Sequence, residues 1–144
     1  LQKRKRYVNF FENDPTLSLV NGVKELIQFL HKQNLTLVLA SSSAMVNINR
    51  VFSRFDLNKY FTAKISGADL TASKPHPEIF EKATILGGVS KEHCIVVEDS
   101  DNGIKAANQA GVFVIGFKNP LSKDQTLINA DLIIENFSEL KKLL

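Results

Sequence analysis

Residues 94–103 read Cys-Ile-Val-Val-Glu-Asp-Ser-Asp-Asn-Gly, an apolar run that ends in a cluster of acidic and small polar side chains. A continuous run of β-branched residues is typical of a strand covered on both faces, as strands of parallel sheets are. The polar cluster marks the point where the strand ends and the chain turns. We therefore predict a buried strand over 94–98, with Glu98 and Asp99 at its carboxyl end.

The rest of the chain alternates similar runs with segments of helical period. Apolar runs predict further strands at 35–41, 112–117 and 132–134, and a shorter one at 64–67. Apolar residues spaced three and four apart predict helices that begin near residues 23, 48, 77, 104 and 137. This alternation predicts an α/β protein with a doubly wound parallel sheet that is flanked by helices on both faces.

Composition and charge exclude several classes of protein. The 144 residues, 44% hydrophobic and 23% charged, are ordinary for one globular domain. A net charge of +3 does not indicate a nucleic-acid partner, and we interpret the basic run at residues 3–6 as the solvated face of a helix. No apolar run approaches the roughly 20 residues of a membrane span, so we expect no membrane partner. The one cysteine, Cys94, excludes an internal disulfide and favours a reducing, cytoplasmic compartment.

Residues that can carry chemistry follow the predicted strands, and ligands of open α/β sheets bind at those strand ends. Ser41 and Ser42 come before a helix, where hydroxyls and free N–H groups can bind an anion or simply cap the helix. Lys74 lies in the proline-rich loop at 73–77, where it can neutralise a phosphate or a nucleophilic carboxylate, or can be a solvated loop lysine.

The carboxylates of Glu98 and Asp99 predict a cation site, because the turn at the strand end lets both approach one ion. Oxygen ligands of this kind suit Mg²⁺. The alternative is that Ser100 or Asp101 merely caps the next helix. No Gly-x-Gly-x-x-Gly or Walker loop is present, which disfavours a dinucleotide-binding module, and the three histidines lack ligand spacing.

Taken in order, Ser41, Ser-Lys-Pro-His-Pro-Glu at 73–78 and Glu-Asp-Ser-Asp-Asn-Gly at 98–103 resemble motifs of the haloacid dehalogenase superfamily. The closest resemblance is to its β-phosphoglucomutase-like phosphatases and mutases, over about residues 18–136. It implies a Rossmann-like sheet and Mg²⁺-dependent phosphoryl transfer from a small phosphorylated substrate.

The same resemblance implies roles for individual residues. Ser41 and the backbone N–H of Ser42 would hold a phosphoryl oxygen. Lys74 would neutralise the nucleophile and a second oxygen, and Glu98 and Asp99 would hold Mg²⁺.

The sequence departs from the family at its first motif. An Asp-x-Asp-Gly segment, which would supply the nucleophile and the general acid/base, is absent from the 144 residues. We therefore expect a truncated, inactive core portion of an enzyme. In this interpretation residues 1–14 are the last helix of a mostly absent cap and residues 15–144 are the core domain. The alternative is a degenerate homologue that binds phosphate or a partner without catalysis.

In the family that the sequence resembles, the first motif ends a central strand between those matching 35–41 and 94–98, so its absence implies a missing central strand here. Unpaired buried backbone groups cost about 1–3 kcal/mol each. We therefore expect one of two arrangements. Either a strand from another chain or fragment fills the space, or the strands at 35–41 and 94–98 pair directly.

Overall fold

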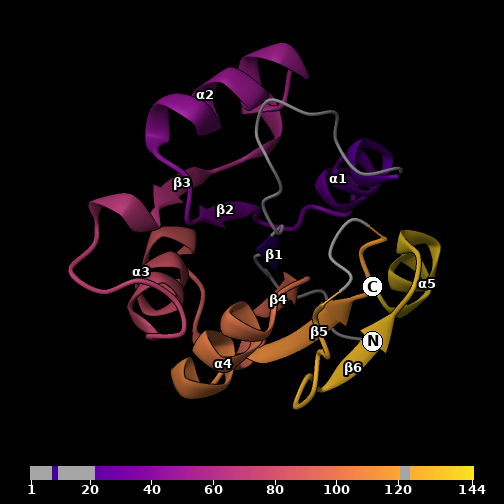
Figure 1. Cartoon of the computed structure of the whole chain (residues 1–144). Helices are drawn as coiled ribbons and strands as arrows, with labels where there is room; N and C mark the ends of the chain where they lie inside the picture. The colour runs from indigo at the N-terminus through magenta and orange to yellow at the C-terminus, as the bar shows by residue number, and fades with distance from the viewer. Residues whose placement is uncertain (1–7, 10–21, 121–123) are drawn as a thin grey trace.

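The computed structural model describes residues 8–9, 22–120 and 124–144. Figure 1 shows a layer of strands with helices on both sides. In chain order the strands and α-helices are β1 (Val8–Asn9), α1 (Val23–Lys32), β2 (Val38–Ser41), α2 (Met45–Arg54), β3 (Ala63–Ser66), α3 (Glu78–Gly87), β4 (Ile95–Glu98), α4 (Asp101–Ala110), β5 (Phe113–Phe117), β6 (Leu132–Ile134) and α5 (Phe137–Leu143). Short 3₁₀ helices stand at Asn58–Tyr60, Gly67–Asp69 and Lys91–His93. The predicted α/β fold is confirmed, and each helix and strand predicted after residue 22 is present.

The pairs formed by the described strands are parallel. β4 pairs with β5 and β5 with β6, while β2 pairs with β3. Glu98 stands opposite Gly116, and Ser41 stands opposite Ser66. This register aligns the carboxyl ends of the paired strands, so Ser41 and Glu98 each end a strand on the same side of the molecule.

The space between β2 and β4 is filled in a way that we did not predict. β1 pairs in parallel with β4, Val8 opposite Ile95 and Asn9 opposite Val96, and lies beside β2. Within the described residues β2 and β4 do not pair with each other, so both expected arrangements are replaced by a strand of this chain. The physical reason is that the edge of buried β4 needs backbone partners, and residues 7–11 are rich in strand-favouring aromatic and β-branched residues.

The helix predicted over residues 1–14 is therefore wrong at Val8 and Asn9, which form β1. The rest of that segment lies outside the described residues. The spacing of Leu1, Val8 and Phe11 suggested a helix. That spacing is weak evidence, because Tyr7, Val8, Phe10 and Phe11 also form a short apolar run, and such runs do not distinguish a helix from a strand.

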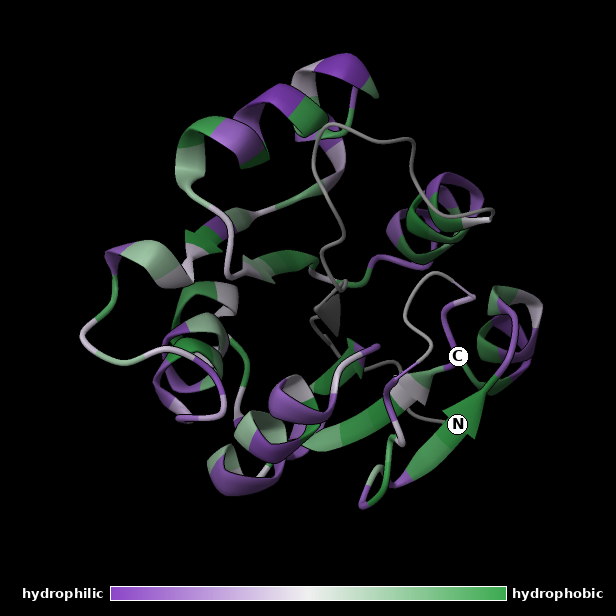
Figure 2. Ribbon diagram, in the orientation of Figure 1, coloured by the Kyte–Doolittle hydropathy of each residue, from purple (hydrophilic) through white to green (hydrophobic). Residues whose placement is uncertain are grey.

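The core consists of two apolar layers, one on each face of the strands. Alternate residues of β4 face opposite layers, as strand geometry requires: Ile95 and Val97 face one side and Val96 the other. The first layer joins the strands to α1, α2 and α5, and the second joins them to α3 and α4. Figure 2 shows the apolar strands between helices whose polar residues face outward.

Glycines end two of the helices, α3 and α4. Gly88 and Gly111 follow α3 and α4 in the left-handed conformation, with φ of 67° and 76°. Ala106, Ala107 and Ala110 are buried, and their small side chains let α4 lie close to the sheet. In the part of the chain that the structure describes, no helix combines the length and apolar character needed to cross a bilayer.

Candidate active site

The predicted site residues come from the ends of different strands and from one loop. Ser41 ends β2, Glu98 ends β4, and Asp99 follows Glu98 directly. Lys74 lies in the loop before α3. Ser41, Glu98 and Asp99 are all buried. Buried carboxylates without partners are strongly unfavourable, so the contacts of each one show how the site is built.

Lys74 and Glu98 form a buried ion pair. Lys74 Nζ lies 2.5 Å from Glu98 Oε2, and the two side chains are 10% and 2% exposed. The ammonium also lies 3.5 Å from the carbonyl oxygen of Ala40 and 5.1 Å from the centre of the Phe80 ring. Of the two interpretations of Lys74, the solvated loop lysine is therefore excluded. The lysine charge is held at the strand ends, directly beside the residue that precedes Ser41.

The first turn of α4 shapes the position of Glu98. Ser100 is the N-cap of α4: its Oγ accepts a hydrogen bond from Gly103 N at 3.0 Å and donates one to Glu98 Oε1 at 3.2 Å. A Cβ atom added to Gly103 would lie 2.0 Å from Glu98 Cδ. Because Gly103 has no side chain, the Glu98 carboxylate can occupy this space. Ser100 thus caps the helix and also contacts a site carboxylate.

Asp99 has a different partner, which the sequence did not reveal. Asn119 Nδ2 donates a hydrogen bond to Asp99 Oδ2 over 2.7 Å, and both residues are 5% exposed. Asn119 follows β5 by two positions, so it reaches the same side of the sheet as Asp99. The strand-end rule that identified Ser41 and Glu98 could have identified Asn119 if it had been applied to β5.

The serines after β2 form a turn rather than a helix cap. The N-cap of α2 is Ala44, so the interpretation of Ser41 and Ser42 as a plain cap is wrong. Ser41 Oγ accepts a hydrogen bond from Ser43 N at 3.0 Å, and Ser42 is exposed. Ser66, at the end of β3, donates to the carbonyl oxygen of Ser43 at 2.6 Å, a support that sequence reasoning missed.

Asp101 ties α4 to the segment before β6. Its carboxylate accepts hydrogen bonds from Thr126 N at 3.1 Å and Leu127 N at 2.7 Å. Burial raises the pKa of Asp101, but these two backbone donors and the Thr126 hydroxyl lower it by more, so the net shift is downward. Asp101 is therefore an anchoring carboxylate, and the cation site is left to Glu98 and Asp99.

The donors at the strand ends are oxygens, which fits a hard cation. Within the described residues no group of three or more His, Cys, Asp or Glu side chains could hold a metal ion. Two carboxylates, Glu98 and Asp99, still suit Mg²⁺, which usually takes one or two protein carboxylates together with water or phosphate oxygens. The chemistry of the donors therefore fits the predicted ion.

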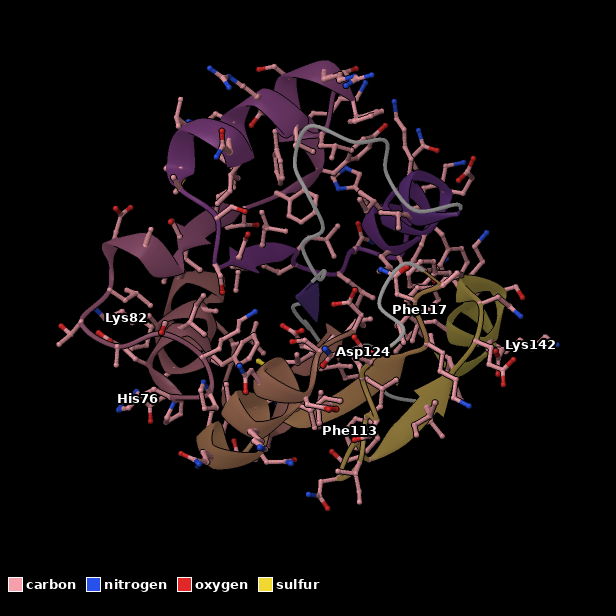
Figure 3. All side chains as sticks on the ribbon, in the orientation of Figure 1. His76, Lys82, Phe113, Phe117, Asp124 and Lys142 are labelled. Atoms are coloured by element: carbon pink, nitrogen blue, oxygen red, sulfur yellow. The ribbon has the colours of Figure 1, made fainter. Side chains whose placement is uncertain are left out.

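His76 and the outer lysines are not part of this site. Figure 3 shows His76 and Lys82 at the periphery, on the side of α3. His76 Nδ1 accepts a hydrogen bond from Glu78 N at 3.1 Å, so it stabilises the start of α3. Lys82 Nζ pairs with Glu78 at 3.2 Å on the helix surface. These contacts are structural and lie outside the Lys74–Glu98 pair.

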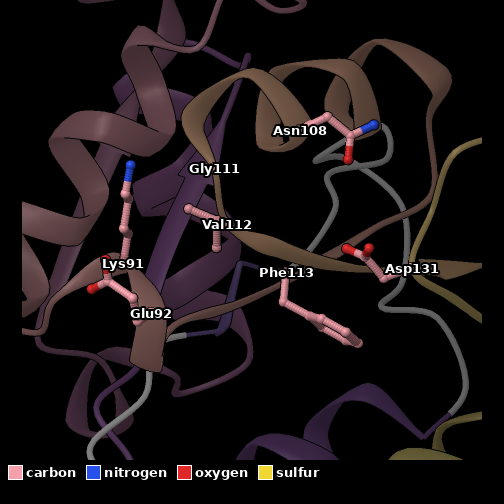
Figure 4. Close-up of a pocket in the computed structure, with 7 residues that line it drawn as sticks. All are labelled: Lys91, Glu92, Asn108, Gly111, Val112, Phe113 and Asp131. Carbon is pink, nitrogen blue, oxygen red and sulfur yellow. The ribbon is translucent and has the colours of Figure 1, made fainter.

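A hollow of about 500 Å³ lies at the opposite ends of the strands (Figure 4). Its lining comes from Lys91, Glu92, Asn108, Gly111, Val112, Phe113 and Asp131. Asp131 accepts a hydrogen bond from Val114 N, and Asn108 donates one to the carbonyl oxygen of Asn129. These polar groups serve to join elements. Because ligands of α/β sheets bind at the carboxyl ends, the hollow is not the candidate active site.

Comparisons with known proteins identify the family of the chain. Residues 1–117 match the family described as haloacid dehalogenase-like hydrolase. The chain is 32% identical to hexitol phosphatase B of Escherichia coli strain K12 over 128 residues, which are 88% of this chain and 58% of the relative. It is 32% identical to β-phosphoglucomutase of Bacillus subtilis strain 168 over 122 residues, covering 85% of this chain and 51% of the relative. The chain thus spans about half the length of the curated relatives it matches.

A solved structure shares the fold. The crystal structure of CbbY from Rhodobacter sphaeroides in complex with phosphate matches with a TM-score of 0.78 and 26% identity. The match covers 85% of this chain and 56% of the CbbY chain. The similarity therefore includes most of the strands and helices around the candidate site.

Proposed function

This chain belongs to the haloacid dehalogenase-like hydrolase family, and we propose that it is the core portion of a Mg²⁺-dependent enzyme that transfers phosphoryl groups from small phosphate esters. The observation that carries the proposal is the buried Lys74–Glu98 pair beside Asp99 at the strand ends. A fixed ammonium next to acidic oxygens is what phosphoryl transfer with a hard cation requires. Similarity to hexitol phosphatase B and β-phosphoglucomutase supports phosphorylated sugars as the substrate class.

The phosphoryl group would be held by the turn after β2. Ser41 Oγ accepts the N–H of Ser43, which leaves the Ser41 hydroxyl proton to donate to a phosphoryl oxygen. The backbone N–H of Ser42, at an exposed position, would donate to the same oxygen. Lys74, held near the carbonyl of Ala40, would neutralise charge on a second oxygen. Positioning and charge stabilisation are the main contributions in phosphoryl transfer.

Glu98 and Asp99 would hold Mg²⁺ with their carboxylate oxygens. When bound, the ion would neutralise charge on the phosphate ester. Glu98 already bonds Lys74 through Oε2 and Ser100 through Oε1, so its charge is shared. Asp99 accepts a hydrogen bond from the neutral amide of Asn119, and this contact orients one of its oxygens.

The chain by itself is expected to bind but not to turn over substrate. Its 144 residues contain no Asp-x-Asp-Gly segment to supply the nucleophile and the general acid/base. In this proposal residues 15–144 belong to the core domain, to which Val8 and Asn9 also contribute a strand that pairs with β4. The absence of that motif from the sequence also favours a second candidate function, a non-catalytic homologue that binds phosphate or a partner.

We further propose a cytoplasmic location with a small phosphorylated ligand as the partner. Cys94 is buried and forms no disulfide, as expected in a reducing compartment. The net charge of +3 gives no reason to expect nucleic acid as a further partner.

A binding and turnover experiment tests the proposal. Inorganic phosphate is titrated against the purified chain with ³¹P NMR, and release of phosphate from sugar phosphates is assayed in parallel. Lys74→Met should abolish phosphate binding because it removes the fixed charge. Lys82→Met is the matched control, since Lys82 forms only an exposed pair with Glu78, and it should bind like the parent.

The outcomes separate the two candidate functions. An enzyme core should bind phosphate more tightly when Mg²⁺ is added, whereas a simple phosphate binder should not respond to the ion. Equal phosphate binding by both lysine variants would contradict the site. Release of phosphate by the chain alone, dependent on Mg²⁺, would contradict its expected inactivity.

A further inference from the structure

Asn119 is a buried polar residue outside every motif that the sequence analysis used. Its amide nitrogen lies 2.7 Å from Asp99 Oδ2, and both residues are 5% exposed. A carboxylate only accepts hydrogen bonds, so the amide N–H must be the donor. We propose that Asn119 is a positioning residue that orients the Asp99 carboxylate for a divalent cation. This inference rests on the proposed function of the same site.

The neutral amide suits this role better than a charged partner. Glu98, adjacent in the chain, is paired with the Lys74 ammonium at 2.5 Å, which compensates its charge. An amide donor fixes one oxygen of Asp99 without itself bringing a positive charge beside the carboxylate. The two buried carboxylates therefore differ in what they offer a cation. The Asp99 side chain is held in place by a neutral donor, whereas Glu98 is held by a charged one.

The backbone around Asn119 holds it firmly enough for this role. Glu98 of β4 stands opposite Gly116 of β5, so the two strands deliver Asp99 and Asn119 to neighbouring positions. Lys118 N, just before Asn119, donates a hydrogen bond to the carbonyl oxygen of Ile134 at 2.9 Å. The following residue, Pro120, biases the Asn119 backbone toward an extended conformation. Asn119 thus lies just beyond the end of β5, and the residue before it is hydrogen-bonded to β6.

Hydrogen bonds that orient a metal-binding carboxylate influence metal affinity strongly. Removing such a partner typically weakens metal binding by about 10- to 100-fold. We expect this loss in Asn119→Ala and in Asn119→Leu, which lacks the donor but nearly keeps the volume. Asn108→Ala is the matched control, because the Asn108 amide bonds the carbonyl of Asn129 at the surface of α4.

The experiment uses the full chain and two probes. Mg²⁺ affinity is measured by isothermal titration calorimetry, with Mn²⁺ and electron paramagnetic resonance as a second reading. Binding of inorganic phosphate without metal is measured by ³¹P NMR, since that ligand would use Ser41 and Lys74 and should be unaffected by Asn119. A selective loss of cation affinity in the folded Asn119 variants, with Asn108→Ala like the parent, supports the inference.

Other results overturn it in distinguishable ways. Unchanged Mg²⁺ affinity in the Asn119 variants rejects the positioning role while the proposed function stands. A parallel loss of phosphate binding, or failure of both variants to fold, shows that Asn119 is only structural. If the parent and Asp99→Asn have the same Mg²⁺ affinity, the metal part of the proposed function fails and the inference fails with it.

Discussion

Glu98 and Asp99 are neighbours in the chain and both are buried, yet their surroundings differ in kind. Around Glu98 lie the Lys74 ammonium, the Ser100 hydroxyl that caps α4, and Gly103, whose missing side chain makes room for the carboxylate. The region around Asp99 contains the neutral amide of Asn119. The Lys74 ammonium places a positive charge against Glu98, whereas the Asn119 amide orients Asp99 through a neutral hydrogen bond. Burial alone therefore does not indicate how a carboxylate is used.

The largest expected effect comes from breaking the Lys74–Glu98 pair. Lys74→Met leaves Glu98 buried without its cation, which should lower the free energy of unfolding by about 3–5 kcal/mol. Adding Glu98→Gln to Lys74→Met should restore much of that loss, because no uncompensated charge then remains. Urea unfolding followed by circular dichroism measures both.

The control for that comparison is an exposed pair. Lys82→Met breaks the surface pair with Glu78 and should change the free energy of unfolding by less than about 1 kcal/mol. If Lys74→Met is as mild as Lys82→Met, the buried pair does not stabilise the Glu98 region and the contrast with Asp99 is lost.

A smaller effect is expected from filling the space beside Glu98. In an exposed helix, glycine to alanine usually stabilises by about 0.5–1 kcal/mol. Gly103→Ala should instead destabilise by about 1–3 kcal/mol, because the new Cβ would lie 2.0 Å from Glu98 Cδ and displace it. Asn102→Ala, at an exposed neighbouring position on α4, serves as the control and should be nearly neutral. A stabilising Gly103→Ala in thermal unfolding would show that Glu98 moves aside freely.

The smallest expected effect on stability concerns Asp101, a third carboxylate. Like Asp99 it accepts hydrogen bonds from neutral N–H groups, but it is partly exposed. Its pKa is lowered in the folded protein: burial raises it, and the N–H groups of Thr126 and Leu127 lower it by more. A lowered pKa contributes stability above the unfolded value of about 3.9, and this contribution disappears as pH falls through the folded value.

Asp101→Asn should therefore cost about 1 kcal/mol near neutral pH, from weaker hydrogen bonds. The difference in the free energy of unfolding between Asp101→Asn and the parent should become smaller as the pH falls toward about 3. Urea unfolding across that range measures it. Asp124→Asn, at an exposed aspartate in the neighbouring segment, is the control for removing one negative charge near neutral pH. A difference that widens in acid would reverse the assigned direction of the Asp101 shift.

Sequence patterns predicted the elements around the site because the relevant signals are local. The apolar run before Glu98 and the helical period after Asp101 depend on neighbouring residues only. The same locality explains the failure at Val8 and Asn9, whose strand conformation depends on the edge of β4 rather than on their own spacing. Asn119 was missed because a single asparagine after a strand is an ordinary turn residue.

The sequence alone determined the order of helices and strands and the position of Ser41, Glu98 and Asp99 at strand ends. Both follow from hydrophobic periodicity and turn-forming residues, which depend only on neighbours in the sequence. Only the tertiary structure decided which partners meet. Lys74 reaches Glu98 across 24 positions of the chain, and Asn119 reaches Asp99 across 20. Such contacts depend on strand order and register. These follow from packing the whole sheet and are not encoded in any single segment.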